Sequence, residues 1–133
     1  MDTRDKVKTL SQSDDLLAHG RWTIVIGYFD PLTVEHATCL HQLVSPETKL
    51  MAVIAIENDD LLPAMARAAL VASLRDVDAV VADEAEWRLW VTGHADSLTG
   101  HQVIDRREED RLLRSQFERH VLRRQAMPVA PSA

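Results

Sequence analysis

The stretch of residues 22–43, WTIVIGYFDPLTVEHATCLHQL, constrains the fold of this chain more than any other segment. An apolar strand over residues 22–27 is followed, after a short turn, by a helix that begins near Thr33 and carries His36 in its first turn. The first backbone N–H groups of a helix have no partner within it, and the helix dipole places about half a positive charge there. A strand that leads directly into such a helix end therefore predicts a site for an anion such as phosphate.

Apolar runs of strand length alternate with segments of helical periodicity along the chain. The runs are continuous, which is typical of strands buried on both faces of a parallel sheet. We therefore predict an α/β fold, a Rossmann-like doubly wound parallel sheet of about four to five strands with flanking helices. The predicted strands are residues 22–27, 50–56, 78–82 and 102–105, and the predicted helices are residues 3–19 (a short helix or two turns), 33–44, 63–75, 84–91 and 106–125.

The length of 133 residues fits one domain. We predict that this domain covers residues 1–125 and that residues 126–133 form a flexible tail. Ligands of doubly wound sheets bind beyond the carboxyl ends of the strands. This rule brings residues 28–36, 57–60 and 83–86 together around one crevice.

Composition and charge argue against several classes of function. A net charge of −6 disfavours nucleic-acid binding, which needs a basic surface. No apolar run approaches the ~20 residues of a membrane span, and the first ten residues lack the apolar core of a signal peptide. We therefore predict a cytoplasmic protein with no membrane partner. Cys39 is the only cysteine, so we expect no internal disulfide, and no residue spacing predicts a metal site.

Two segments resemble the signatures of the cytidylyltransferase-like nucleotidyltransferases. The first is Gly27-x-Phe29-Asp30 followed by His36, which is similar to the family pattern G-x-F-D-x-x-H-x-G-H. The second, over residues 67–81, is similar to the family pattern R-x-x-x-L-x-x-L-R-x-V-D-x-V-V. The resemblance covers residues 21–83 and has the two segments in the family's order.

The resemblance implies a reaction and a set of site residues. Members of this family transfer a nucleotidyl group from CTP or ATP to a phosphorylated acceptor, release pyrophosphate and use Mg²⁺. By resemblance, this chain binds CTP or ATP where strand 22–27 meets its helix and acts on a small phosphorylated sugar or alcohol. The implied catalytic residues are His36 and Thr33, and the implied nucleotide-binding residues are Gly27, Tyr28, Phe29, Asp30, Asp59 and Arg67.

Two of these residues also have a structural interpretation. Asp30 either contacts the nucleotide or ties down the turn ahead of the helix, because Asp is a preferred helix cap and turn residue. Arg67 either reaches nucleotide phosphates or lies solvated on its helix.

The chain departs from the family pattern at several working positions. Thr33 stands in place of the first histidine, and Glu35 stands in place of the glycine. Residues 61–66, LLPAMA, have no basic side chain where relatives carry a basic loop, and the Ser/Thr run before the last helix is reduced to residues 97–100. Loss of one transition-state donor typically costs about 10²–10³ in rate. We therefore expect weak or lost nucleotidyl transfer, and the alternative is a catalytically inactive nucleotide-binding or assembly domain.

Two further expectations concern the C-terminal half. The apolar surface of residues 87–90, WRLW, fits a homodimer contact. Glu108, Glu109 and Asp110 alternate in charge with neighbouring arginines, which predicts a solvated face at the start of the last helix. The apolar face of that helix is formed by Leu113, Phe117 and Val121.

Overall fold

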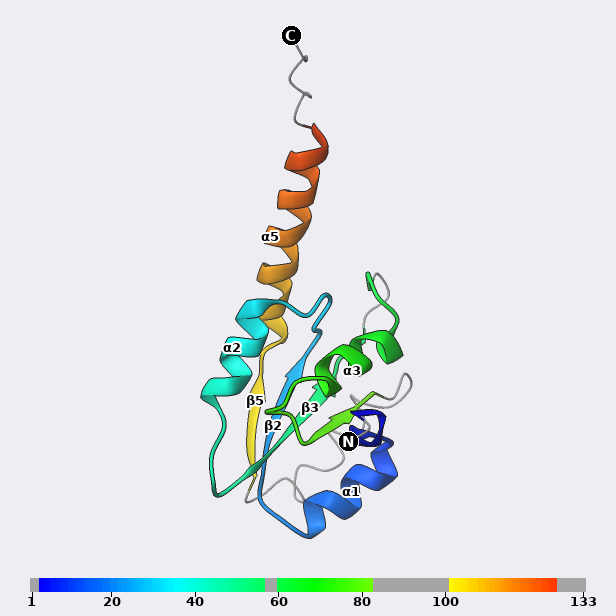
Figure 1. Ribbon diagram of the computed structural model, residues 1–133, viewed down its shortest axis with the longest axis vertical. Coiled ribbons are helices and arrows are strands. Elements are labelled where there is room, and N and C mark those ends of the chain that lie inside the picture. Colours follow the sequence, from blue (N-terminus) through cyan, green and yellow to red (C-terminus); the bar gives the residue numbers. More distant parts are fainter. Residues whose placement is uncertain (1–2, 57–59, 83–100, 127–133) are drawn as a thin grey trace.

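The computed structural model describes residues 3–56, 60–82 and 101–126, which form an α/β fold around one sheet (Figure 1). The strands are β1 (Val7–Lys8), β2 (Trp22–Gly27), β3 (Lys49–Ile54), β4 (Ala79–Val81) and β5 (Gln102–Asp105). The helices are α1 (Leu10–Ala18), α2 (Val34–Gln42), α3 (Ala64–Ala72) and α5 (Arg107–Ala126), and a 3₁₀ turn, η1 (Thr3–Lys6), precedes β1.

The sheet has the strand order β1-β4-β3-β2-β5, and all four neighbouring pairs are parallel. From β2 the chain proceeds through β3 to β4 on one side, whereas β5 pairs with the opposite side of β2. The order therefore reverses at β2, and the carboxyl ends of β2 and β5 flank the switch point at which such sheets bind ligands. The predicted Rossmann-like doubly wound parallel sheet is confirmed.

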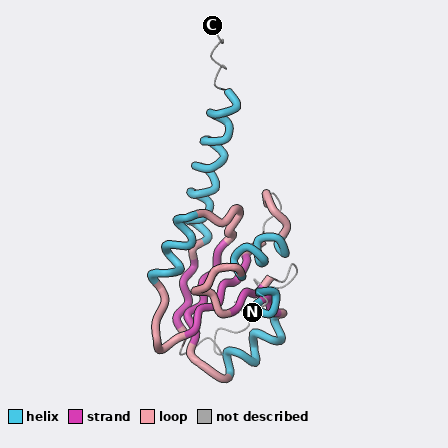
Figure 2. Tube along the Cα trace, viewed as in Figure 1, coloured by secondary structure: helices cyan, strands magenta, loops and turns pink. Residues whose placement is uncertain are grey.

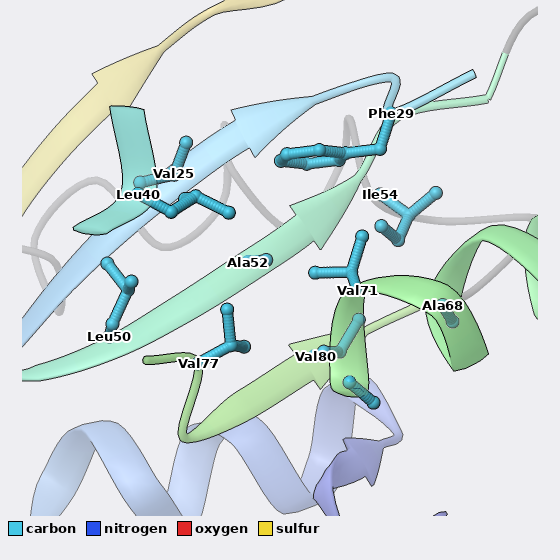
Figure 3. Packing of buried hydrophobic residues seen from close by; sticks show 11 residues of the cluster. Val25, Phe29, Leu40, Leu50, Ala52, Ile54, Ala68, Val71, Val77 and Val80 are labelled. Carbon is cyan, nitrogen blue, oxygen red and sulfur yellow. The ribbon is translucent and has the colours of Figure 1, made fainter. Parts of the chain in front are cut away.

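Helices cover both faces of the sheet (Figure 2). One face packs Ile24 and Ile26 of β2 against Leu17 of α1. On the other face Val25 lies beside Leu40 of α2, and Val71 of α3 lies beside Ile54 and Val80 in the same cluster, as seen from close by in Figure 3. Consecutive residues of β2 thus enter opposite cores, which is why its sequence is a continuous apolar run.

The C-terminal helix departs from this layered arrangement. Its start follows β5 and lies beside β2, but the rest of α5 projects beyond the body of the molecule (Figure 1). Several of its apolar side chains are exposed, namely Leu112, Phe117, Val121 and Leu122. None of the described helices combines the length and the apolar character that are needed to cross a bilayer.

The predicted elements differ from the observed ones mainly at the N-terminus. The helix predicted over residues 3–19 is confined to α1, and residues 7–8 instead form β1 at the edge of the sheet, paired with β4. Helix α3 ends at Ala72 rather than at residue 75, and Pro63 is its N-cap rather than its first helical residue. The helix predicted over residues 84–91, the surface of residues 87–90 and the predicted tail after Ala126 lie outside the described residues.

Candidate functional site

The chain leaves the carboxyl end of β2 in a sharp turn at Phe29. Phe29 has a φ of 49°, in the left-handed region that non-glycine residues seldom occupy. Its ring is fully buried in the core beside Val25 and Ile54 (Figure 3), which holds this backbone conformation in place. The peptide bond between Asp30 and Pro31 is cis. This turn exposes backbone polar groups of Tyr28 and Phe29 to neighbouring side chains rather than to another strand.

Three N–H groups converge on a single carboxylate, that of Asp110 in the first turn of α5. The backbone N–H of Tyr28 donates to Asp110 Oδ2 at 2.7 Å, and the N–H of Phe29 donates to the same oxygen at 3.4 Å. His36 Nε2 lies 2.9 Å from Asp110 Oδ1. We call these three groups, Tyr28 N–H, Phe29 N–H and His36 Nε2–H, the donor cluster. A carboxylate that is 1% exposed, as Asp110 is, requires such donors.

The hydrogen bonds around His36 determine which of its nitrogens carries the proton. The backbone N–H of Thr33 points at His36 Nδ1 at 3.0 Å. A backbone N–H can only donate, so Nδ1 must offer its lone pair and the proton must lie on Nε2. The hydroxyl of Thr33 also lies 2.9 Å from Nδ1. His36 is therefore held as the neutral Nε2–H tautomer, aimed at Asp110, and both of its ring nitrogens are engaged by the protein.

Gly27 leaves the space that the Asp110 carboxylate occupies. A Cβ atom added at Gly27 would lie 2.5 Å from Asp110 Oδ2 and 3.0 Å from Phe29 Cε2. Real Cβ atoms do not approach other atoms so closely, so a side chain here would displace the carboxylate. The glycine of the sequence motif is thus required for close approach of an anion to the end of β2.

A second polar cluster, centred on a cation, lies on the other side of Tyr28. Arg67 of α3 is fully buried, and its Nη1 donates to the carbonyl oxygens of Tyr28 (2.9 Å) and Ala55 (2.8 Å). Its Nη2 donates to Asp60 Oδ2 at 2.7 Å. We call these acceptors, Tyr28 C=O, Ala55 C=O and the Asp60 carboxylate, the acceptor cluster. Arg67 joins the carboxyl ends of β2 and β3, so the alternative of a solvated helix arginine is wrong.

Asp30 ties the turn after β2 to the segment before α3. Its Oδ2 accepts the backbone N–H of Leu61 at 2.6 Å, and its Oδ1 accepts that of Leu62 at 2.8 Å. Arg114 Nη1 lies 3.7 Å from Asp30 Oδ2. Asp30 is 3% exposed, and these contacts agree with the structural interpretation of the residue.

Glu35 lies on the exposed side of the first turn of α2. A hydrogen bond from its own backbone N–H, followed by one from the Thr33 hydroxyl, holds the pKa of the Glu35 carboxyl below its usual value. The residue is therefore ionised near the positive end of the helix dipole, where a negative charge is stabilising. It does not fill the space between α2 and the end of β2.

The arginines at this edge come from α5 rather than from the segment before α3. Arg111 Nη2 donates to the Tyr28 hydroxyl at 2.8 Å, and its guanidinium lies 5.4 Å from the centroid of the Tyr28 ring. Arg107 makes a bidentate contact with Asp105, from Nε to Oδ1 and from Nη2 to Oδ2. Together with Arg114 beside Asp30, these side chains place positive charge around the switch point.

Most of the residues singled out from the sequence meet at this edge of the sheet. Gly27, Tyr28, Phe29, Asp30, Thr33, His36 and Arg67 lie within the two clusters or directly beside them. Asp59 lies outside the described residues.

The charge pattern predicts a solvated face for Asp110, and that prediction is wrong. Glu108 and Glu109 are exposed, but Asp110 is 3% exposed and bound to the donor cluster. A signal was available, because Asp110 precedes Leu113 by three positions and Phe117 by seven, and therefore lies on the apolar face of the helix.

A pocket of about 480 Å³ lies at the opposite edge of the sheet, where its lining includes Trp22, Lys49 and His19. That edge carries the amino ends of the strands, where doubly wound sheets do not usually bind ligands. We therefore take the carboxyl edge of β2 as the candidate site. Within the described residues, no group of three or more His, Cys, Asp or Glu side chains is arranged to hold a metal ion.

No model of a known protein family matches the sequence, and no curated protein is significantly similar to it.

Proposed function

We propose that this protein is a cytoplasmic member of the cytidylyltransferase-like nucleotidyltransferases, that it binds CTP or ATP at the junction of β2 and α2, and that it has weak or lost transfer activity toward a small phosphorylated sugar or alcohol. The observation that carries the proposal is the donor cluster. Two successive backbone N–H groups and a buried imidazole N–H converge on one negatively charged group at the switch point. Such converging donors are a general way to bind phosphate oxygens.

Two features favour weak rather than efficient transfer. His36 is held as a neutral donor, so it supplies a hydrogen bond but no positive charge to a reacting phosphate. Thr33 stands where the family pattern has its first histidine, and it uses its backbone N–H to orient His36 rather than to contact a phosphate. Because catalysis of phosphoryl-group transfer depends mainly on positioning and on charge stabilisation, these losses reduce the rate more than the binding.

The described residues do not fit a Mg²⁺ ion held by the protein alone. The nearest buried carboxylates, Asp30 and Asp110, each accept two backbone N–H groups. Mg²⁺ commonly binds through one or two carboxylates together with substrate phosphates. We therefore expect any Mg²⁺ to enter bound to the triphosphate.

Thermal unfolding with CTP, ATP and inorganic pyrophosphate, each with and without Mg²⁺, tests the proposal. A ligand at 100 times its dissociation constant stabilises the fold by about 2.7 kcal/mol, which shifts the melting temperature visibly. Cytidine and adenosine serve as controls, because without phosphate they cannot use the donor cluster. Absence of a shift with every phosphorylated ligand at millimolar concentration would contradict nucleotide binding, provided that it holds both for the natural sequence and for Asp110→Ala, which removes the carboxylate from the donor cluster.

Transfer itself is tested by pyrophosphate release. We expect little release from the natural sequence and a gain of turnover in the double variant Thr33→His with Glu35→Gly, which restores the family pattern. Turnover by the natural sequence at the rate of that variant would show that the departures do not impair catalysis.

An assembly role is the second candidate, and the exposure of α5 favours it. Phe117 is 41% exposed, Leu112 is 60% exposed and Leu122 is 62% exposed on a helix that projects from the body (Figure 1). A homodimer would bury such side chains. Sedimentation across a range of concentrations tests this, since a single 15 kDa species throughout would remove the candidate.

A further inference from the structure

The anion that fills the donor cluster belongs to the protein. Asp110 supplies both carboxylate oxygens, one to the two backbone N–H groups and one to His36. Asp110 belongs to α5 and lies 82 positions from Tyr28 along the chain. The group that a phosphate would replace is therefore a single side chain on a separate helix.

We propose that Asp110 is an intramolecular occupant of the phosphate site, and that α5 thereby inhibits nucleotide binding until Asp110 withdraws. This inference rests on the proposed function, because it concerns the regulation of the same site. Its basis is the sharing of donors, since a phosphate oxygen and the Asp110 carboxylate need the same three N–H groups.

The space at the end of β2 does not admit both anions. A Cβ atom at Gly27 would already lie 2.5 Å from Asp110 Oδ2, so the carboxylate fills the volume that the glycine leaves. The Asp110 side chain is 1% exposed, and that of its partner His36 is 3% exposed. Two negative groups at contact distance in such a buried site also repel each other strongly. Phosphate binding and the Asp110 contact are therefore mutually exclusive.

The attachment of α5 is suited to release. Side-chain contacts that join α5 to the turn after β2 are made near its start, by Asp110, by Arg111 with the Tyr28 hydroxyl and by Arg114 with Asp30. Beyond these contacts the helix is largely exposed, so moving it uncovers little of the core. His36 would keep its orientation during the movement, because Thr33, the N-cap of α2, holds it independently of α5.

Isothermal titration calorimetry on the full chain tests the inference with inorganic pyrophosphate, CTP and ATP as probes. Asp110→Ala frees the donor cluster, and we expect it to bind at least one of these probes ten or more times tighter than the natural sequence does. Asp110→Asn removes the charge but keeps the shape and one acceptor oxygen, so we expect a smaller gain, and it serves as the second variant if Asp110→Ala does not fold. Glu109→Gln is the matched control, because it removes an exposed charge from the same helical turn.

The possible outcomes separate this inference from the proposed function. Tighter binding by the Asp110 variants, with Glu109→Gln unchanged, supports both. Equal binding by all four proteins overturns the inhibition and leaves nucleotide binding in place. Weaker binding by the Asp110 variants would mean that Asp110 helps to hold the ligand, which also overturns the inhibition. Binding by none of the proteins contradicts the inhibition and the proposed function together.

Discussion

The two polar clusters at the end of β2 differ in the charge of their central side chain and in the backbone groups that it satisfies. On one side of Tyr28, a buried cation, Arg67, satisfies carbonyl oxygens and a carboxylate. On the other side, a buried anion, Asp110, satisfies N–H groups. The same residue, Tyr28, gives its C=O to the first cluster and its N–H to the second.

This difference determines which cluster can exchange its partner for a ligand. Buried carbonyl groups require a donor, and the negatively charged metabolites that a cell contains in abundance cannot supply one in place of Arg67. Buried N–H groups can donate to any anion of suitable size, including a phosphate. The acceptor cluster is therefore structural, and the donor cluster is the one suited to binding.

Removal of Arg67 should have the largest effect on stability. We expect Arg67→Met to lower the free energy of unfolding by about 3–5 kcal/mol, because it leaves Asp60 and two backbone carbonyls without their buried cation. Urea denaturation measures this loss. Arg75→Met, at an exposed position after α3, is the control and should change stability little. A loss below about 1 kcal/mol for Arg67→Met would mean that the acceptor cluster is not structural.

Gly27→Ala should act selectively on the donor cluster. The added Cβ would displace Asp110 Oδ2, and overpacking of this kind costs about 1–3 kcal/mol. The cost should shrink when the substitution is made in an Asp110→Ala background, because the 2.5 Å contact with Asp110 Oδ2 is then removed and only the contact with the Phe29 ring remains. A double-mutant cycle by thermal or urea unfolding measures this coupling, and additive effects would contradict the close approach.

Asp30→Asn should have an intermediate effect. An amide retains one acceptor oxygen, so one of the two N–H groups of Leu61 and Leu62 loses its partner at a cost of about 1–2 kcal/mol. Asp15→Asn, on the exposed side of α1, removes a charge without this consequence and serves as the control. Equal stability of the two variants in chemical denaturation would disprove the tie between the turn after β2 and the start of α3.

The smallest effect should come from Asp105, which precedes α5. The Arg107 side chain donates hydrogen bonds that lower the pKa of the Asp105 carboxyl below its ordinary value of 3.8. A lowered folded-state pKa contributes stability that is present above the unfolded pKa and is lost as the pH falls through the folded pKa. We therefore expect Asp105→Asn to cost at most about 0.5 kcal/mol at pH 7, since the pair is partly exposed.

Unfolding measured from pH 7 down to pH 2 checks the sign. The difference between Asp105→Asn and the natural sequence should disappear at the acidic end, where the carboxyl is protonated. A difference that grows toward low pH would contradict the assignment.

The fold was predictable because its signals are local and strong. The run WTIVIG predicted β2 with its observed bounds, and the residues QVID predicted β5 in the same way. Strand β1 was missed because two residues carry no periodicity, and they become a strand only through pairing with β4. Edge pairing of this kind is a tertiary property.

The site was only partly predictable, for a different physical reason. The motif located Gly27, Phe29, Asp30 and His36 correctly at one edge of the sheet. The burial of Arg67 depends on where the carbonyls of Tyr28 and Ala55 point, and no local pattern in the sequence encodes that geometry.

Asp110 illustrates a separate error. Its neighbours Glu108 and Glu109 gave the segment a solvated composition, whereas its spacing of three from the half-buried Leu113 placed it on the less exposed side of the helix. Position on the helix was the better guide than the charge of adjacent residues.

Because α5 is long, a small rotation at its start produces a large movement at its end. Its 20 residues span about 30 Å, and Asp110 sits close to the end that touches the sheet. A tilt of about 10° at that end would carry the far end through roughly 5 Å. Replacement of the Asp110 carboxylate by another anion at Tyr28 would thus produce a much larger displacement at the far end of the helix. A fluorescent pair, with one dye near Arg124 and the other on the body, would detect that displacement at a distance from the site.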